Sequence, residues 1–188
     1  MCQDLFDRWL GGDEKAFREI YRLHYPRISQ FAATLIGNGS DGEDLAQETF
    51  LRLYRSQERY RREGISNGRA LIYTIVRRLA FQFAEYRMRW ERLSNDYEAI
   101  SWSMISPERS PHDELSDAEI RTYTELAIDR LPEPQREIIL LRHREELTYQ
   151  EIGQILGCSA ERVKSRLHYA RTLLRAALQK LRMPSEPG

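Results

Sequence analysis

Apolar residues recur at intervals of three and four positions along almost the whole chain, the spacing of one face of an α-helix. No run alternates apolar and polar residues as a half-buried β-strand would. Helix-breaking residues divide this pattern at Gly11-Gly12, at Pro26 and at Gly37-Asn38-Gly39. The pattern therefore predicts an all-α fold in which one helix ends at Pro26.

The N-terminal part of the chain is predicted to consist of short helices followed by one long helix. Asp13 is a suitable N-cap for the helix that ends at Pro26, and Ser40 with Glu43 matches the S-x-x-E capping box of the next helix. That helix is expected to face the core with Leu45, Ala46, Thr49, Phe50, Leu53 and Tyr54. Residues 56–68 are polar and contain two glycines, so we expect a loop there. A long helix follows over about residues 69–90. Its predicted buried stripe is Ile72, Ile75, Val76, Leu79, Phe83, Tyr86 and Trp90.

Residues 93–118 interrupt the helical pattern. Two prolines, several serines and six acidic residues leave little that could pack into a core. This segment is predicted to be an acidic linker between two small helical domains, residues 1–92 and 119–183. The last residues, 184–188, are predicted to be a disordered tail.

The sequence YQEIGQILGCSAERVKSRLHYARTLL, which begins at Tyr149, predicts a helix-turn-helix in the C-terminal domain. Thr148 and Glu151 are predicted to form a capping box at the start of the first helix. Gly157 can terminate this helix in a left-handed conformation, and Ser159 can cap the second. Gly153 is expected where two helices cross closely. The second helix would bury Val163, Leu167, Ala170 and Leu174 and expose Glu161, Arg162, Lys164, Ser165, Arg166, His168, Tyr169 and Arg171. An αα-hairpin with a solvated basic face is the alternative.

The net charge of the chain is zero, but the charges are unevenly distributed. Residues 51–92 carry 11 basic and 4 acidic side chains, and residues 160–188 carry 7 and 2. The segments between and before them are acidic. Two separated basic blocks are typical of a chain with two surfaces that face a polyanion, although ordinary solvated helix faces would also give them.

Other classes of protein are disfavoured by what the sequence does not contain. Cys2 and Cys158 do not form a disulfide framework, and the four histidines lack metal-ligand spacing. We therefore expect neither a metal site nor a cofactor. The sequence shows no catalytic motif and no phosphate-binding glycine loop, so we do not expect an enzyme or a small-molecule substrate. It shows neither a long apolar segment nor a secretory signal, so we expect a cytoplasmic protein without direct membrane insertion.

Two segments of the chain resemble the extracytoplasmic function (ECF, group 4) sigma factors of the sigma-70 family. LPEPQREIILLRHREELTYQEIGQILGCSAERVKSRLHYAR resembles their region 4. GDEKAFREIYRLHYPRI, followed by DGEDLAQETFLRLYR, resembles their region 2. The likeness extends from about residue 5 to residue 182. It implies a protein that binds core RNA polymerase and brings it to promoter DNA. The acidic linker resembles the family's connector, which threads the polymerase cleft, and a merely soluble tether is the alternative.

The resemblance also implies roles for particular residues. Polymerase docking is assigned to Asp44, Gln47, Glu48, Leu51, Arg52 and Arg55. Capture of the unpaired −10 strand, by phosphate attraction and base stacking, is assigned to Tyr60, Arg61, Arg62, Tyr73, Arg77, Arg78, Phe81 and Gln82. Tyr73 and Phe81 could instead be core residues. Reading of the −35 duplex is assigned to Glu161, Arg162, Lys164, Ser165, Arg166, His168 and Arg171.

Some positions depart from the family pattern. The family commonly has Trp at the position of Leu71, Asn at Arg78, Asp at Gln82 and Thr at Arg162. The resemblance therefore predicts the role of each surface and not the promoter sequence that it reads. An anti-sigma factor is a further implied partner. A stand-alone helix-turn-helix regulator, which would bind an operator without polymerase, remains the alternative.

Overall fold

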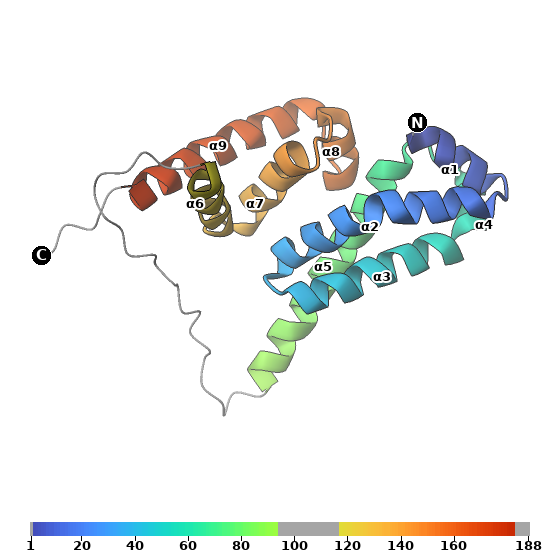
Figure 1. Cartoon of the computed structure of the whole chain (residues 1–188), viewed down its shortest axis with the longest axis horizontal. Helices are drawn as coiled ribbons and strands as arrows, with labels where there is room; N and C mark the ends of the chain where they lie inside the picture. The colour runs from blue at the N-terminus through green and yellow to red at the C-terminus, as the bar shows by residue number, and fades with distance from the viewer. Residues whose placement is uncertain (1, 94–116, 183–188) are drawn as a thin grey trace, which may run out of the picture.

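The computed structural model describes residues 2–93 and 117–182, and every regular element in these two ranges is helical (Figure 1). The all-α prediction is therefore confirmed. The N-terminal group consists of α1 (Cys2–Leu10), α2 (Glu14–Ile36), α3 (Gly39–Arg55), α4 (Gln57–Glu63) and α5 (Gly68–Leu93). The C-terminal group consists of α6 (Asp117–Asp129), α7 (Glu133–Ile139), the π-helical turn η1 (Leu140–Arg144), α8 (Tyr149–Leu156) and α9 (Ala160–Arg182). The predicted linker, apart from its ends, and the predicted tail lie outside the described residues, so the domain boundaries stay a prediction.

Helix α2 continues through Pro26, and the prediction of a helix end there was wrong. A proline inside a helix removes one hydrogen bond and costs about 3 kcal/mol. Ile20, Ile28 and Phe31, on both sides of Pro26, are fully buried in the core. Burial of one such side chain stabilises the fold by about 1.5–3 kcal/mol, so the packing of α2 outweighs the local preference.

The turn between α2 and α3 differs from the turn that the sequence predicted. Gly37 ends α2 with a φ of 72°, and the side chain of Asn38 caps α3 by accepting a hydrogen bond from the Ser40 backbone N–H at 3.1 Å. The predicted capping box of Ser40 and Glu43 was therefore wrong. Gly42 lies where α2 and α3 touch: a Cβ at this position would be 2.6 Å from the Cα of Ala33. The hairpin is closely packed because this position has no side chain.

Part of the predicted loop over residues 56–68 is helical, since α4 spans Gln57–Glu63. The side chain of Tyr60 is buried, and Gly64 ends the helix in the left-handed region with a φ of 66°. Gln57 donates a hydrogen bond of 2.5 Å to the backbone carbonyl of Trp9 in α1. One buried aromatic ring and one long-range hydrogen bond thus order a segment whose local composition is polar.

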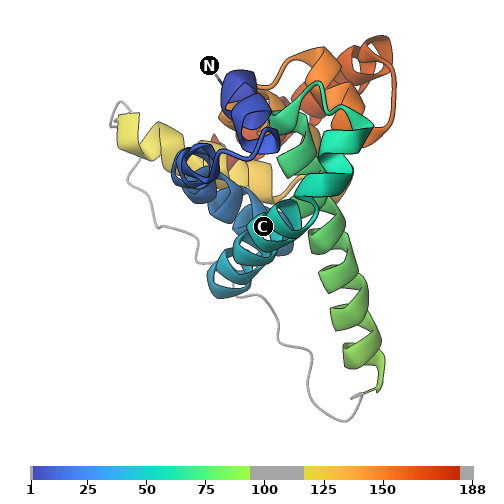
Figure 2. The ribbon, with the colours of Figure 1, turned by 90° about the vertical axis from the view of Figure 1, so that its right-hand side faces the viewer.

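The two groups of helices pack against each other. Helix α8 lies beside the N-terminal half of α5, and α7 contacts α2 (Figures 1 and 2). The buried apolar residues of both groups form one continuous cluster. The relative placement of the two groups decides which of their surfaces face solvent and which face each other.

Candidate functional site

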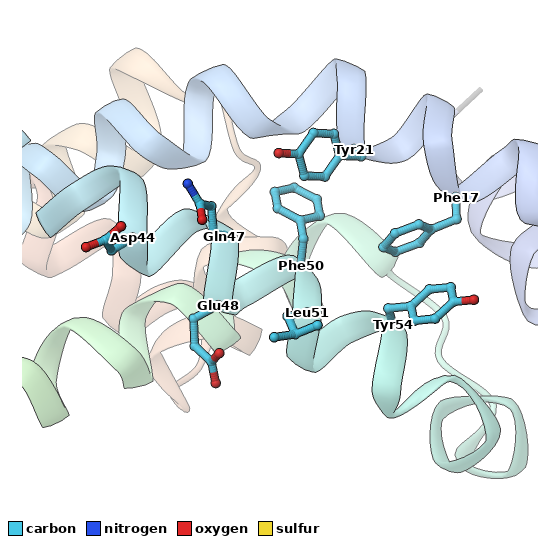
Figure 3. A pocket seen from close by; sticks show the side chains of 8 residues that line it. All are labelled: Phe17, Tyr21, Asp44, Gln47, Glu48, Phe50, Leu51 and Tyr54. Carbon is cyan, nitrogen blue, oxygen red and sulfur yellow. The ribbon is translucent and has the colours of Figure 1, made fainter. Parts of the chain in front are cut away.

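An open groove of about 630 Å³ lies between α2 and α3 (Figure 3). Its floor is aromatic: the ring centroids of Phe17 and Tyr54 are 5.0 Å apart, and so are those of Tyr21 and Phe50. Leu51 and Tyr54 are 41% and 44% exposed, which is unusual for side chains of this size. The groove is therefore a preformed apolar surface that faces solvent.

Acidic and polar side chains border this groove. Asp44 and Gln47 are exposed and Glu48 is half-buried, and all three lie on α3 along the groove (Figure 3). Arg52 pairs with Glu48 at 2.6 Å, and Arg55 is exposed. All six residues assigned to polymerase docking therefore lie on the outer side of α3. An apolar floor with acidic borders is suited to an amphipathic helix that carries basic residues.

The sequence interpretation missed part of the groove. Tyr54 was expected in the core, but nearly half of its surface is exposed. Phe17 and Tyr21 come from α2 and had no assigned role. Only the packing of α2 on α3 brings these rings beside Leu51. The sequence does contain a signal for this groove, because aromatic residues recur on one side of α2 and on one side of α3.

The residues assigned to single-strand capture fall into two sets. Arg61, Arg62, Arg78 and Gln82 are exposed on α4 and α5. Tyr60 and Tyr73 are buried, and Arg77 and Phe81 are half-buried. The expectation that Tyr60 lies on a solvent-facing surface is wrong, because Tyr60 is buried and anchors α4. For Tyr73 the structure shows the alternative, a buried residue, and its hydroxyl faces the C-terminal group. The predicted burial of Tyr86 was also wrong, since 66% of its surface is exposed.

Arg77 forms an ion pair between the two groups of helices. Its Nε lies 2.6 Å from Oε1 of Glu137 in α7, and its guanidinium lies 4.6 Å from the ring centroid of Phe81. Glu137 is 2% exposed, so nearly all of this carboxylate is removed from water. Burial raises the pKa of Glu137, and the opposing attraction of Arg77 does not fully compensate.

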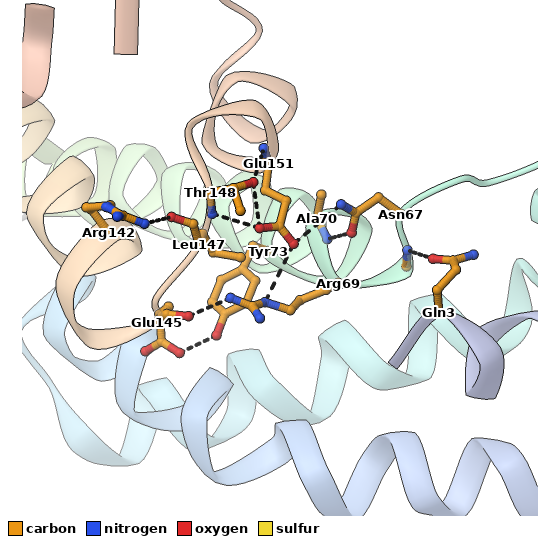
Figure 4. A network of polar contacts seen from close by, with 11 residues as sticks. Gln3, Asn67, Arg69, Ala70, Tyr73, Arg142, Glu145, Leu147, Thr148 and Glu151 are labelled. Atoms are coloured by element: carbon orange, nitrogen blue, oxygen red, sulfur yellow. Dashed lines mark hydrogen bonds and ion pairs between the residues drawn. The ribbon is translucent and has the colours of Figure 1, made fainter. Parts of the chain in front are cut away.

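A second carboxylate of the C-terminal group engages α5. The hydroxyl of Tyr73 donates a hydrogen bond to Glu145, and the two side chains point toward each other (Figure 4). Glu145 directly follows the π-helical turn, and its N–H bonds to the carbonyl of Leu140 at 3.0 Å. Burial raises the pKa of Glu145, against the hydrogen bond from Tyr73, and raises the pKa of Tyr73 well above its usual value.

Arg69 extends this network to α8. It donates a hydrogen bond of 2.6 Å to the backbone carbonyl of Glu145, and its Nε lies 3.9 Å from Oε1 of Glu151 (Figure 4). Glu151 also completes the predicted capping box with Thr148, which is confirmed: the Thr148 N–H donates to Glu151 Oε2 at 2.7 Å. Burial raises the pKa of Glu151, but its bonds to Thr148 and its proximity to Arg69 outweigh burial and lower the pKa.

The helix-turn-helix of α8 and α9 forms as the sequence predicted. Gly157 ends α8 with a φ of 67°, and the Arg162 N–H donates to Ser159 Oγ at 3.3 Å. The role expected for Gly153 differs: an added Cβ would lie 2.6 Å from the backbone carbonyl of Cys158, so the turn itself, and not a helix crossing, requires glycine. Val163, Leu167 and Ala170 are buried, as predicted, whereas Leu174 is half-buried.

The outer face of α9 carries most of the residues assigned to duplex reading. Those that are exposed are Glu161, Arg162, Lys164, Ser165, His168 and Arg171. Arg166 is half-buried and lies near the Glu137 carboxylate, whose pKa it lowers. Arg171 lies 3.3 Å from His143 Nε2. The free cations of this face are therefore chiefly Arg162 and Lys164, near the N-terminus of the helix.

The described parts of the chain contain neither a cluster of metal ligands nor a membrane-spanning helix. Within residues 2–93 and 117–182, no three side chains of His, Cys, Asp or Glu are grouped so that they could hold a metal ion. None of the helices in these two ranges is both long and apolar enough to cross a bilayer.

These features define a helix-turn-helix protein with a second group of helices that carries an open aromatic groove. Comparison with protein families gives a match to sigma-70 region 2 over residues 20–90 and to sigma-70 region 4 over residues 127–176. The chain belongs to the sigma-70 family and is a sigma factor.

Curated relatives are ECF RNA polymerase sigma factors. SigE of Mycolicibacterium smegmatis is 35% identical over 174 residues, a match that covers 90% of this chain and 65% of SigE. The chain thus spans just under two thirds of the length of that relative. SigW of Bacillus subtilis is 27% identical over 173 residues, which cover 90% of this chain and 92% of SigW.

Two solved structures share the fold. RpoE of Bartonella quintana, crystallised with the anti-sigma factor NepR, is 27% identical with a TM-score of 0.69 and covers 88% of this chain and 98% of RpoE. CnrH, solved with the cytosolic domain of CnrY, is 20% identical with a TM-score of 0.68 and covers 95% of this chain and 97% of CnrH. The second likeness supports the fold alone.

Proposed function

We propose that this chain is a group 4 (ECF) sigma factor that binds core RNA polymerase in the cytoplasm and directs it to specific promoters. The observation that carries the proposal is the presence, in one chain, of a solvent-facing aromatic groove on α2 and α3 and an exposed cationic reading helix, α9. It acts by binding, and we propose no catalytic activity of its own.

The groove between α2 and α3 is the proposed site of polymerase docking. Leu51 lies beside the aromatic floor, and Asp44 and Glu48 supply negative charge along its border. A polymerase helix with apolar and basic residues fits this groove. Its apolar side chains would be buried on the aromatic floor, and its basic side chains would pair with the acidic border. The relative SigW, an ECF RNA polymerase sigma factor by name, supports the same kind of partner.

Helix α9 is the proposed reader of the −35 duplex. Arg162 and Lys164 are exposed within its first two turns, the part of a recognition helix that reaches base edges in the major groove. Arginine can bind guanine through two hydrogen bonds, while lysine and the helix N-terminus bind phosphates. Ser165 and His168 lie on the same exposed face and could contact adjacent bases.

The surface of α4 and α5 is the proposed site of −10 strand capture. Arg61, Arg62 and Arg78 are exposed cations that can attract phosphates. Phe81, with Arg77 over its ring, offers a stacking surface for an unpaired base. Tyr73 and Arg77 are engaged by the C-terminal group, so their participation requires the two groups to separate.

An anti-sigma factor is a proposed further partner. Bartonella quintana RpoE was solved in complex with the anti-sigma factor NepR, and that protein matches most of this chain. A partner of this kind would inhibit by covering the groove or the α5 surface.

Run-off transcription with purified core polymerase on a pool of genomic promoter fragments tests the proposal. We expect specific transcripts that appear only when both the chain and the polymerase are present. Tight operator binding by the chain alone, without any specific transcript on addition of polymerase, would instead identify a stand-alone regulator.

A further inference from the structure

The interface between the two groups of helices covers part of the surface proposed to capture single-stranded DNA. Tyr73 is 1% exposed, and its hydroxyl is engaged by Glu145. Arg77 is half-buried and is paired with Glu137. A carboxylate and a phosphate are both oxyanions that accept hydrogen bonds from arginine and tyrosine. Glu137 and Glu145 therefore engage donor groups of Arg77 and Tyr73 that a DNA phosphate could also engage.

The masking is selective, because the other two proposed surfaces remain open in the same structure. The groove is lined by residues of α2 and α3 alone. Arg162 and Lys164 on α9 face solvent. A chain in this arrangement can reach polymerase and duplex DNA while Tyr73 and Arg77 of α5 are unavailable.

The ion pair that crosses the interface is suited to being broken. Burial of the Glu137 carboxylate opposes the attraction of Arg77, and a buried ion pair often contributes little net stability for this reason. Its geometry is nevertheless specific, since removal of one partner leaves a charge without compensation. Such a contact fixes one arrangement of the domains, and a competing polyanion can displace it.

We propose that the pairs Glu137–Arg77 and Glu145–Tyr73, which we call the interdomain clasp, hold the free chain in a closed state that masks part of its single-strand-binding surface. DNA then competes with the two carboxylates for Arg77 and Tyr73. The apparent affinity for a single strand falls in proportion to the fraction of open molecules. The nature of the competing ligand rests on the proposed function, whereas the existence of the clasp does not.

A charge-swap experiment on the full chain tests the clasp without DNA. Small-angle X-ray scattering gives the radius of gyration of the wild type, of Glu137→Arg, of Arg77→Glu and of the double variant. Each single substitution places like charges together, so we expect a larger radius. The double variant restores an ion pair and should return to the wild-type radius. Glu133→Arg, an exposed position one turn earlier on α7, is the matched control and should stay compact.

Circular dichroism identifies a variant that fails to fold. In that case Glu145→Lys offers an independent route, because Arg27, Arg69 and Arg144 all act on this carboxylate and would repel a lysine. Unchanged radii for the folded single variants, or a double variant that stays expanded, would overturn the clasp.

A binding measurement then tests the masking. The probe is a labelled single-stranded oligonucleotide of mixed sequence, followed by fluorescence anisotropy. Glu137→Arg and Glu133→Arg change the net charge equally, so their comparison removes the general electrostatic effect. We expect Glu137→Arg to bind at least about 10-fold more tightly than Glu133→Arg. Equal affinities would mean that the clasp masks no strand-binding surface.

The two proposals can fail separately. If wild-type chain and core polymerase give no specific run-off transcript, the proposed function is wrong, while the scattering result still decides the clasp. If transcripts form but the charge swap has no effect, only the clasp is wrong.

Discussion

The carboxylate of Glu137 lies 2.6 Å from the Nε of Arg77, although the two residues are 60 positions apart in the chain. This ion pair joins α7 to α5 across the interface of the two groups of helices. It turns an arginine that the sequence assigns to DNA into part of an intramolecular contact. The accessibility of one functional surface is thereby coupled to the position of the other domain.

The groove predicts a specific loss of polymerase binding. We expect Leu51→Glu to weaken association with core polymerase at least about 10-fold, roughly 1.4 kcal/mol, because a charge replaces an apolar contact at the edge of the aromatic floor. Titration of labelled core polymerase measures the affinity. Leu23→Glu is the control: Leu23 is 46% exposed on α2 but does not line the groove. An equal effect of both substitutions would show that general surface charge, and not the groove, is responsible.

The reading helix predicts unequal contributions from the arginines of α9. Arg162→Ala should weaken promoter binding by about 1–3 kcal/mol, the usual contribution of a base-contacting arginine. The yield of promoter-specific run-off transcript should fall as a result. Arg175→Ala, exposed farther along the same helix, should have a much smaller effect. Run-off yields at several promoter concentrations give the comparison. If Arg162→Ala behaves as Arg175→Ala does, the N-terminal part of α9 does not read the promoter.

The α2–α3 hairpin predicts opposite effects at two glycines. Gly42→Ala would place a Cβ 2.6 Å from the Cα of Ala33, so the helices must separate, and we expect the free energy of unfolding to fall by about 1–3 kcal/mol. Gly39→Ala meets no atom within 4 Å and should leave the protein equally or slightly more stable. Urea unfolding measures both. A neutral Gly42→Ala would mean that the contact between the two helices can relax without loss.

His24 predicts a pH dependence of stability. Burial, together with Arg69 and Arg27, lowers the pKa of this side chain from 6.5 to about 4. The folded protein therefore resists protonation that the unfolded chain accepts. The stabilising contribution is present above pH 6.5 and is lost as the pH falls through about 4, on the order of 2–3 kcal/mol in total.

His24→Gln removes this titration. The decrease in the free energy of unfolding between pH 7 and pH 4.5 should be smaller for His24→Gln than for the wild type, with urea unfolding at each pH as the measurement. Because each protein is compared with itself, altered packing at this position cancels. Equal decreases would contradict a buried, neutral His24.

Local sequence signals determined much of the fold and of the reading helix. Helical periodicity gave the all-α class, and the caps at Asp13, Thr148 and Ser159 and the glycine at Gly157 lie where they were expected. Each of these features depends on residues within one or two turns. A chain segment carries that information whatever it later packs against.

Tertiary packing decided the features that depend on distant partners. Helix α2 continues through Pro26, Tyr60 orders α4, and Tyr54 lies exposed beside Phe17. In each case the outcome depends on whether a neighbouring helix covers the position or leaves it open to solvent. Sequence periodicity defines a helix face but not the element that covers it.

The candidate site shows the same division. The sequence by itself determined that α3, α5 and α9 carry charged and aromatic residues suited to a protein and a polyanion. Only the tertiary structure decided that Tyr73 and Arg77 are covered while Leu51 and Arg162 are open. Pairing of Arg77 with Glu137 requires two helices to meet across 60 residues of chain, and such a meeting is set by the packing of whole domains and not by local preference.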